Sequence, residues 1–176
     1  MPRIISGEYG GLVIKTPRYA LHPTSDRVKE YIFNVIKVWK GLTVVDLFAG
    51  SGSLGLEALS RGADAVDFVD NHALAISTIT ENLKILSPMD KTIRRFKANA
   101  QTFCTKYPHY YDRIFADPPY QLPLQDSFFL SVANALKSHG LFILEYSVHS
   151  HDKFFVPLTL LREKKFGETG VRIYEK

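Results

Sequence analysis

The chain has 176 residues, of which 45% are hydrophobic and 23% charged, with a net charge of +4 and an isoelectric point near 9.1. This length fits one domain that buries roughly 70% of its unfolded surface, and the composition excludes a disordered protein. The single cysteine, Cys104, excludes an internal disulfide. The longest apolar runs are too short to span a membrane, and the N-terminus lacks the pattern of a signal peptide. We therefore expect a cytoplasmic protein.

Residues 1–40 are expected to form an N-terminal extension. Apolar residues at positions 4–5 and 12–14 flank the turn-rich stretch Gly7-Glu8-Tyr9-Gly10-Gly11, which is typical of a small β-hairpin. A helix is expected to begin near Asp26, capped by one of residues 24–26, because an apolar stripe with helical spacing follows. The stripe consists of Ile32, Phe33, Ile36 and Trp39.

From residue 41 onward, expected strands and helices alternate. The strands are Thr43–Phe48, Ala65–Asp70, Thr92–Lys97, Arg113–Asp117 and Leu141–Tyr146. The helices are Leu54–Ser60, Ala73–Leu86, Ala100–Lys106 and Ser127–Lys137. This alternation predicts an α/β fold, in which a parallel sheet is covered by helices on both faces.

The C-terminal end departs from the alternation. Leu158–Phe166 and Val171–Glu175 are separated by Gly167-Glu168-Thr169-Gly170, which is typical of a hairpin and so of an antiparallel edge. The sheet is therefore expected to have seven strands and to be mostly parallel. No long linker interrupts the chain, so residues 1–40 and 41–176 are expected to form a single compact unit.

A glycine-rich loop follows the first strand of this sheet. Gly50 and Gly52 let the backbone approach a ligand closely, and Gly55 allows tight packing of the next helix against a strand. Asp70 ends the following strand, where a carboxylate can hold both hydroxyls of a ribose. The loop therefore predicts a nucleotide-like cofactor.

Two classes of cofactor fit this loop. Gly50, Gly52 and Gly55 satisfy the spacing of a dinucleotide fingerprint, so a nicotinamide cofactor stays open on spacing alone. Asp46, however, puts a carboxylate where a pyrophosphate would lie, and that position favours a cationic amino-acid group. Residues 41–90 also hold seven acids against two bases. These charges favour S-adenosylmethionine.

Asp117-Pro118-Pro119-Tyr120 is the second chemical motif and follows the fourth expected strand. The Asp117 carboxylate and the Pro118 carbonyl can accept hydrogen bonds from the two N–H groups of an exocyclic amine. These bonds direct the nitrogen lone pair towards a methyl donor. Tyr120 offers a face on which a base stacks, a contact worth about 1–3 kcal/mol in nucleic-acid binders. A base inside a helix would first be flipped out.

The distribution of charge points to a nucleic-acid partner. Residues 1–40 hold seven Lys or Arg against three acids, and residues 91–113 hold six against one. Two basic patches beside an acidic pocket suit a phosphate backbone laid across a site for a cationic cofactor, although basic side chains also serve simply as solvated surface. The six histidines show no ligand spacing, so no metal site is predicted.

Asp46 to Gly52, Asp70 and Asp117 to Tyr120 together resemble the motifs of class I amino-methyltransferases, which are Rossmann-like enzymes. More closely, His22 to Glu30, Phe33-Asn34 and Asp46 to Ala63 resemble the bacterial 16S rRNA guanine-N2 methyltransferases of the RsmD type, which modify guanine 966. The similarity runs nearly end to end. One departure is His22, where the family commonly has Arg before its Pro-Thr pair.

The resemblance implies roles for individual residues. The catalytic residues would be Asp117, Pro118, Pro119 and Tyr120. S-adenosylmethionine would be bound by Asp46, Phe48, Ala49, Gly50, Ser51, Gly52, Asp70, Asn71, Asn99 and Ala100. Asn99 fits a helix cap equally well. Contacts to RNA would come from His22, Thr24, Arg27, Arg94 and Arg95.

The resemblance also implies that the partner is 16S rRNA, free or within an assembling small ribosomal subunit, and that the protein acts as a monomer. Residues 1–40 would contact the RNA or cover the cofactor. A DNA adenine-N6 or cytosine-N4 amino-methyltransferase remains the alternative, since those enzymes share Asp-Pro-Pro-Tyr. They commonly add a sizeable target-recognition region, whereas only about 40 residues precede the core here.

Overall fold

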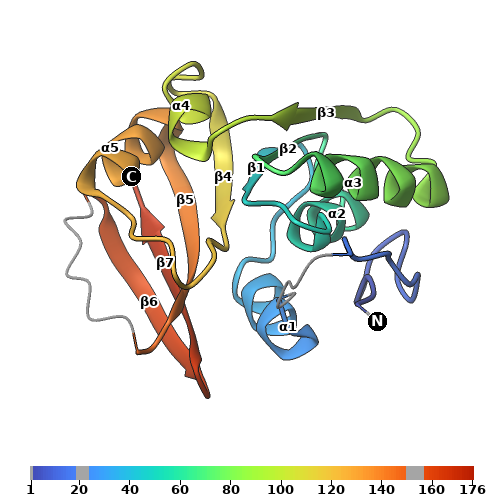
Figure 1. Cartoon of the computed structure of the whole chain (residues 1–176), viewed down its shortest axis with the longest axis horizontal. Helices are drawn as coiled ribbons and strands as arrows, with labels where there is room; N and C mark the ends of the chain where they lie inside the picture. The colour runs from blue at the N-terminus through green and yellow to red at the C-terminus, as the bar shows by residue number, and fades with distance from the viewer. Residues whose placement is uncertain (1, 19–23, 150–156) are drawn as a thin grey trace.

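The computed structural model describes residues 2–18, 24–149 and 157–176, and it contains one seven-stranded sheet (Figure 1). The elements in chain order are α1 (Asp26–Val35), β1 (Thr43–Leu47), α2 (Ser53–Ser60), β2 (Ala65–Asp70), α3 (Ala73–Leu86), β3 (Thr92–Lys97), α4 (Ala100–Cys104), β4 (Tyr111–Ala116), α5 (Asp126–Ala135), β5 (Leu136–Ser147), β6 (Thr159–Phe166) and β7 (Thr169–Glu175). The strand order is β3-β2-β1-β4-β5-β7-β6. Strands β1 to β5 pair in parallel, and β7 is antiparallel to β5 and β6. The expected mostly parallel sheet with an antiparallel hairpin is confirmed.

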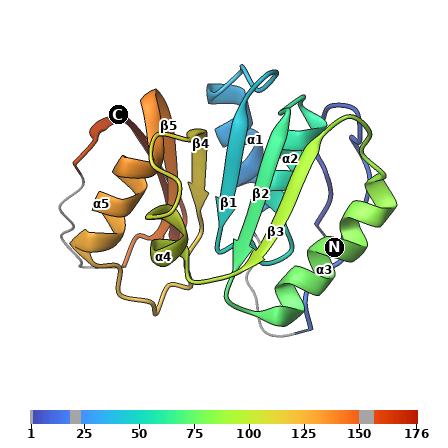
Figure 2. The same cartoon turned by 90° about the horizontal axis from the view of Figure 1, so that it is seen from above.

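Alternating side chains of the central strands divide the core between the two faces of the sheet. Phe115 and Ile143 pack with apolar residues of α1, α2 and α3 on one face. Their neighbours Ala116 and Leu144 pack with α4 and α5 on the other. Figure 2 shows α4 and α5 on the opposite side of the sheet from α1 and α2. Burial on both faces explains why these strands are nearly continuous apolar runs.

The predicted N-terminal hairpin is present as a short antiparallel pairing around the bridge between Arg3 and Val13. Backbone hydrogen bonds join its two arms, from the N–H of Ile4 to the carbonyl of Leu12 and from the N–H of Ile14 to the carbonyl of Pro2. The backbone N–H groups of residues 5 and 6 donate to the carboxylate of Glu57, and that of Lys15 donates to the side chain of Asn82. These bonds attach the hairpin to α2 and α3. The sequence pattern identified the turn but could not show these distant partners.

Helix α1 is shorter than its apolar stripe. Ser25 caps it, with a hydroxyl that accepts a hydrogen bond from the N–H of Val28, and the helix ends at Val35. Trp39 lies beyond the helix but is still buried, with its ring centroid 4.6 Å from that of Phe33. The helical spacing of Trp39 was therefore fortuitous, although its burial was predicted.

Several expected boundaries moved at the C-terminal end. Strand β5 begins at Leu136, directly after α5, whereas the sequence suggested a start at Leu141. The turn between β6 and β7 contains only Gly167 and Glu168, because the pairing extends to Phe166 and Thr169. Gly167 has φ of 62°, in the left-handed region that tight hairpin turns require.

Residues on both sides of position 40 share one core. Ile4, Ile14 and Ile32 belong to the same buried cluster as Phe68 and Ile143 of the sheet. A functional division at residue 40 stays a prediction. No helix in the described ranges combines the length and apolar character that crossing a membrane requires.

Candidate active site

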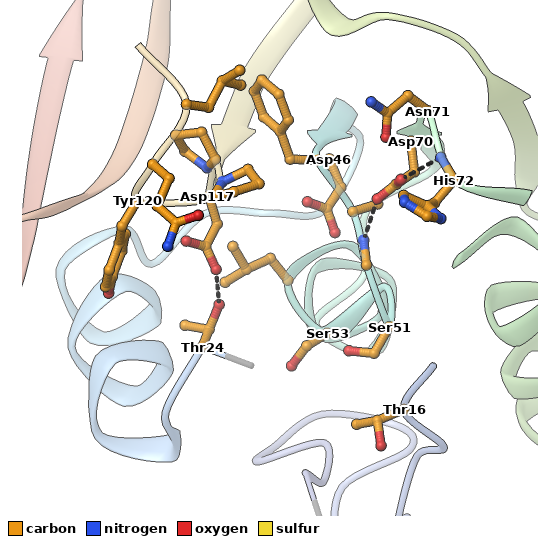
Figure 3. Close-up of a pocket in the computed structure, with 18 residues that line it drawn as sticks. Thr16, Thr24, Asp46, Ser51, Ser53, Asp70, Asn71, His72, Asp117 and Tyr120 are labelled. Carbon is orange, nitrogen blue, oxygen red and sulfur yellow. Dashed lines mark hydrogen bonds between the residues drawn. The ribbon is translucent and has the colours of Figure 1, made fainter. Parts of the chain in front are cut away.

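A cavity of about 650 Å³ opens at the carboxyl ends of β1, β2 and β4, where the strand order of the sheet reverses (Figure 3). Ligands of open α/β sheets bind at such a reversal, and this volume lies in the usual range for small-molecule sites. The predicted site residues that line it are Thr24, Asp46, Phe48, Ala49, Gly50, Ser51, Asp70, Asn71, Asp117, Pro118, Pro119 and Tyr120. Most of the predicted site therefore lies around one cavity.

The loop from β1 to α2 follows an unusual backbone path. Phe48, Gly50 and Gly52 have φ values of 58°, 53° and 80°, all in the left-handed region. Gly52 caps α2, and a Cβ built on Gly55 would lie only 2.4 Å from the ring of Phe68. The expected close packing of the helix against a strand is thus present, and it fixes where the loop passes the cavity.

Asp46 lies at the centre of the cavity wall and is only 2% exposed. One of its oxygens, Oδ2, accepts a hydrogen bond of 2.9 Å from the N–H of Gly55. Burial raises the pKa of Asp46 well above its usual range, and the nearby charges of Asp117 and Asp70 raise it further. A cationic group in the cavity would relieve this repulsion.

Asp70 ties the ends of β1 and β2 together. Its Oδ2 accepts from the N–H of Gly50 at 2.9 Å, and its Oδ1 accepts from the N–H of His72 at 2.8 Å. Each carboxylate oxygen has a second lone pair, so both can also accept from hydroxyl groups of a ligand. Figure 3 shows Asp46 between Asp70 and Asp117 along the wall of the cavity.

Asp117 follows β4 and faces the cavity from the other side of Asp46. Its Oδ2 accepts a hydrogen bond of 3.1 Å from the hydroxyl of Thr24, which precedes α1. Burial raises the pKa of Asp117 to about 7, although this hydrogen bond acts in the opposite direction. Its charge state is therefore balanced near neutral pH.

Tyr120 forms the outer edge of the cavity and is 44% exposed. Its hydroxyl shares a short hydrogen bond with the hydroxyl of Thr169, at the start of β7. The two prolines before it restrict the backbone. The ring is thus held in place while remaining accessible to a flat partner.

The charges around the cavity have one sign. Asp46, Asp70 and Asp117 all line it, and among its described lining residues there is no Lys or Arg. Such a wall repels phosphate groups and attracts cations. A pyrophosphate-containing dinucleotide therefore fits the cavity poorly, whereas a ligand with ammonium and sulfonium charges fits it well.

Three predicted cofactor residues do not line the cavity. Gly52 ends the loop and packs against the core, because a Cβ added to it would meet the side chains of Ile79 and Phe68. Asn99 caps α4, and its side chain accepts from the N–H of Thr102 at 3.1 Å. Ala100 is buried at the start of the same helix. A contact from Asn99 or Ala100 to an adenine ring stays a prediction.

The predicted RNA contacts are scattered. Thr24 is in the cavity, Arg27 lies over the ring of Phe166, and Arg95 is exposed on β3. Arg94 makes two hydrogen bonds to Asp67, of 2.7 and 2.6 Å, so its charge is already partnered within the fold. His22 lies outside the described residues.

Several cavity residues were not predicted from the sequence. Thr16, Ser53, Leu54, His72, Gln121 and Leu122 also line the cavity. Glu145 was assigned no role, yet its carboxyl group lies close enough to Asp117 for their charges to interact. The only hint of this role in the sequence was that Glu145 places a carboxylate within the apolar run Leu141–Tyr146. The described residues contain no cluster of three or more His, Cys, Asp or Glu suited to a metal.

The comparisons with known proteins agree with this geometry. A family model described as "Conserved hypothetical protein 95" matches residues 2–175. The ribosomal RNA small subunit methyltransferase D of Escherichia coli K12 is 30% identical, over 99% of this chain and 89% of the relative. The protein of the same name from Haemophilus influenzae is 32% identical, over 98% and 93%.

A solved structure supports the same relationship. The Escherichia coli protein yhhF is 31% identical, covers 99% of this chain and 97% of its own, and superposes with a TM-score of 0.86. The Rossmann-like class I methyltransferase fold, expected from the motifs, is confirmed. By its motifs, its fold and its relatives, the chain belongs to the RsmD family of ribosomal RNA small subunit methyltransferases.

Proposed function

We propose that this protein transfers a methyl group from S-adenosylmethionine to the exocyclic N2 amine of a guanine in 16S rRNA. The observation that carries the proposal is the position of Asp117 and Tyr120 at the mouth of an acidic cavity lined by the glycine loop. Two relatives that match over nearly the whole chain are named as methyltransferases of small-subunit ribosomal RNA. Their names supply the RNA, and the family resemblance supplies guanine N2.

The residues of the cavity fit S-adenosylmethionine. Asp46 and the backbone of Phe48 to Gly50 would hold its methionine end, because a buried carboxylate and a closely approaching backbone suit an ammonium group. Asp70 would accept from the ribose hydroxyls through the free lone pairs of its two oxygens, with Asn71 beside it. When bound, the cofactor supplies an electrophilic methyl group on a sulfonium.

Asp117 and Pro118 would prepare the amine for reaction. An exocyclic amine is a poor nucleophile because its lone pair is delocalised into the ring. If the Asp117 carboxylate and the Pro118 carbonyl accept hydrogen bonds from its two N–H groups, the nitrogen becomes pyramidal and its lone pair is freed. Asp117 can then take the proton that the methylated amine loses. Positioning of this kind supplies much of the acceleration in such transfers.

Tyr120 would hold the base by stacking. The Tyr120 ring is exposed at the rim, and its hydroxyl is anchored to Thr169. The ring is therefore already ordered before a base stacks on it. A guanine paired within an RNA helix would have to be flipped out to reach Asp117. Two prolines that limit motion of the loop would keep the stacking face aligned with the carboxylate.

The N-terminal extension would contribute to substrate contact. Thr16 and Thr24 come from this extension and line the same cavity as Asp117. We therefore propose that residues 1–40 cover the cofactor or touch RNA at the rim. A substrate in the small ribosomal subunit implies action in the cytoplasm. The monomeric state stays a prediction that sedimentation would test.

The experiment is methyl transfer from labelled S-adenosylmethionine to unmethylated 16S rRNA, to the small subunit that contains it, and to duplex DNA. We expect labelling of the ribosomal substrates. Labelling of the DNA alone would favour the DNA amino-methyltransferase instead.

Asp117→Ala tests the role of the carboxylate in the same assay. We expect transfer to fall by at least 10²-fold, because the amine loses its charged acceptor, while calorimetry finds the cofactor affinity nearly unchanged. Ser77→Ala, an exposed change on α3, serves as the control. Full activity of Asp117→Ala would remove Asp117 from the mechanism.

A further inference from the structure

Glu145 is a buried carboxyl group next to the proposed methyl-transfer site. It lies on β5, where it pairs with Val171 of β7, and it is only 5% exposed. Its Oε2 is buried and has no hydrogen-bond partner in the described part of the chain. An ionised carboxylate in that position would be costly, since buried charges are normally paired.

The register of the sheet makes Glu145 the neighbour of Asp117. Ala116 of β4 pairs in parallel with Leu144 of β5, so the next residues along both strands are Asp117 and Glu145. Side chains alternate between faces, and both Ala116 and Leu144 point towards α4 and α5. Asp117 and Glu145 therefore point together towards the opposite face, where α1 begins.

Thr24, just before α1, donates to only one of the two carboxyl groups. Its hydroxyl donates to Oδ2 of Asp117 at 3.1 Å. A hydroxyl has one proton, so the same proton cannot also be donated to Glu145. This bond favours the ionised form of Asp117, whereas the buried Oε2 of Glu145, which has no partner among the described residues, favours the protonated form of Glu145.

The groups around the pair do not compensate two negative charges. Asp117 and Tyr120 are the titratable side chains that interact with Glu145, and Asp46 adds a further carboxylate near Asp117. Neither Asp117 nor Glu145 forms an ion pair within the described ranges. Burial and the charge of Asp117 raise the pKa of Glu145 to about 9, higher than that of Asp117. Carboxyl groups this close do not both ionise readily.

We propose that Glu145 is a positioning residue: of the neighbouring pair Asp117 and Glu145, Glu145 bears the one proton and so leaves Asp117 as the anionic acceptor. This inference rests on the proposed function for the role of Asp117 in holding the amine. Thr24 donates its only hydroxyl proton to Asp117 and so fixes one oxygen of that carboxylate. An ionised Glu145 would compete for that proton and would add a second negative charge beside Asp117.

The charge states can be read directly, without any substrate. The probe is the carbon NMR signal of the side-chain carboxyl groups in protein labelled with ¹³C-Asp and ¹³C-Glu, followed from pH 5 to pH 10. Glu145→Gln and Asp117→Asn assign the two signals. We expect the Glu145 signal to be that of a protonated acid at pH 7.5 and to titrate above the Asp117 signal. Glu81→Gln, on the exposed face of α3, is the matched control and should leave both signals in place.

Two results would overturn the proposal: both carboxyl groups ionised at pH 7.5, or Asp117 protonated while Glu145 is ionised. The NMR measurement does not depend on catalysis. If the proposed function is wrong, methyl transfer will be absent, but the charge states of Asp117 and Glu145 can still be read.

The dependence of the transfer rate on pH gives a second readout that a purely structural role would not change. Wild type should lose activity above about pH 9 as Glu145 ionises, whereas Glu145→Gln should keep its rate there, because its amide is neutral at every pH. Both proteins should lose activity on the acid side as Asp117 becomes protonated. An equal alkaline loss in Glu145→Gln would contradict the proposed role.

Discussion

At the scale of single residues, the buried carboxylates of the acidic cavity should lower the free energy of unfolding when they are ionised. The pKa of Asp117 is raised to about 7, so the folded state binds its proton more tightly than the unfolded chain does. Stability should therefore fall as pH rises from about 4, where the unfolded carboxyl ionises, to 7. Above pH 7 the full cost of the buried charge is present, and a ligand cation would reduce it.

Asp117→Asn should remove this cost. We expect its melting temperature to exceed that of wild type at pH 8, and the difference to shrink towards zero below about pH 3, where the wild-type carboxyl is neutral in both states. Thermal unfolding followed by circular dichroism at several pH values measures it. A constant difference across this range would mean that Asp117 does not titrate as described.

At the scale of elements, the cavity depends on how closely α2 packs on β2. Gly55→Ala should destabilise the protein by roughly 1–3 kcal/mol through overpacking, because the new methyl group meets the fully buried ring of Phe68. Denaturant unfolding measures the change. The same substitution in a Phe68→Leu background should cost at least about 0.5 kcal/mol less. Equal costs in both backgrounds would show that the ring is not the obstacle.

The elements that the sequence predicted best carry their own periodic pattern. The bounds of β2, α3 and β3 agree with the expected ranges, since alternating or helix-spaced apolar residues define them locally. Contacts with distant partners were missed. The N-terminal hairpin was predicted from its turn, but the sequence holds no local signal for the bonds that attach it to Glu57 and Asn82.

The same distinction applies to the site. Asp46, Asp70 and Asp117 were predicted together because each lies at or near the carboxyl end of a strand, and the carboxyl ends of parallel strands share one edge of the sheet. Glu145 is also on a strand, but only the register of β4 and β5 brings it beside Asp117. An RNA contact from Arg94 stays a prediction, but its pairing with Asp67 on the adjacent strand had no local signal in the sequence.

At the scale of the whole molecule, two neighbouring arginines should affect different properties. Arg95 is exposed, so Arg95→Ala should weaken RNA binding and lower the slope of log affinity against log salt by about 1. Arg94→Ala should instead destabilise the fold by about 1–3 kcal/mol, because Asp67 loses its charged partner. Filter binding at several salt concentrations and denaturant unfolding separate the two. Unchanged RNA binding in Arg95→Ala would remove β3 from the interface.

The most direct test of the proposed reaction is mass analysis of nucleosides from 16S rRNA methylated by the purified protein. The acidic cavity, Asp117 and Tyr120 together predict one product, N2-methylguanosine, and its absence when Asp117→Ala is used. A methylated adenosine or cytidine, or N2-methylguanosine formed equally well by the variant, would contradict the account.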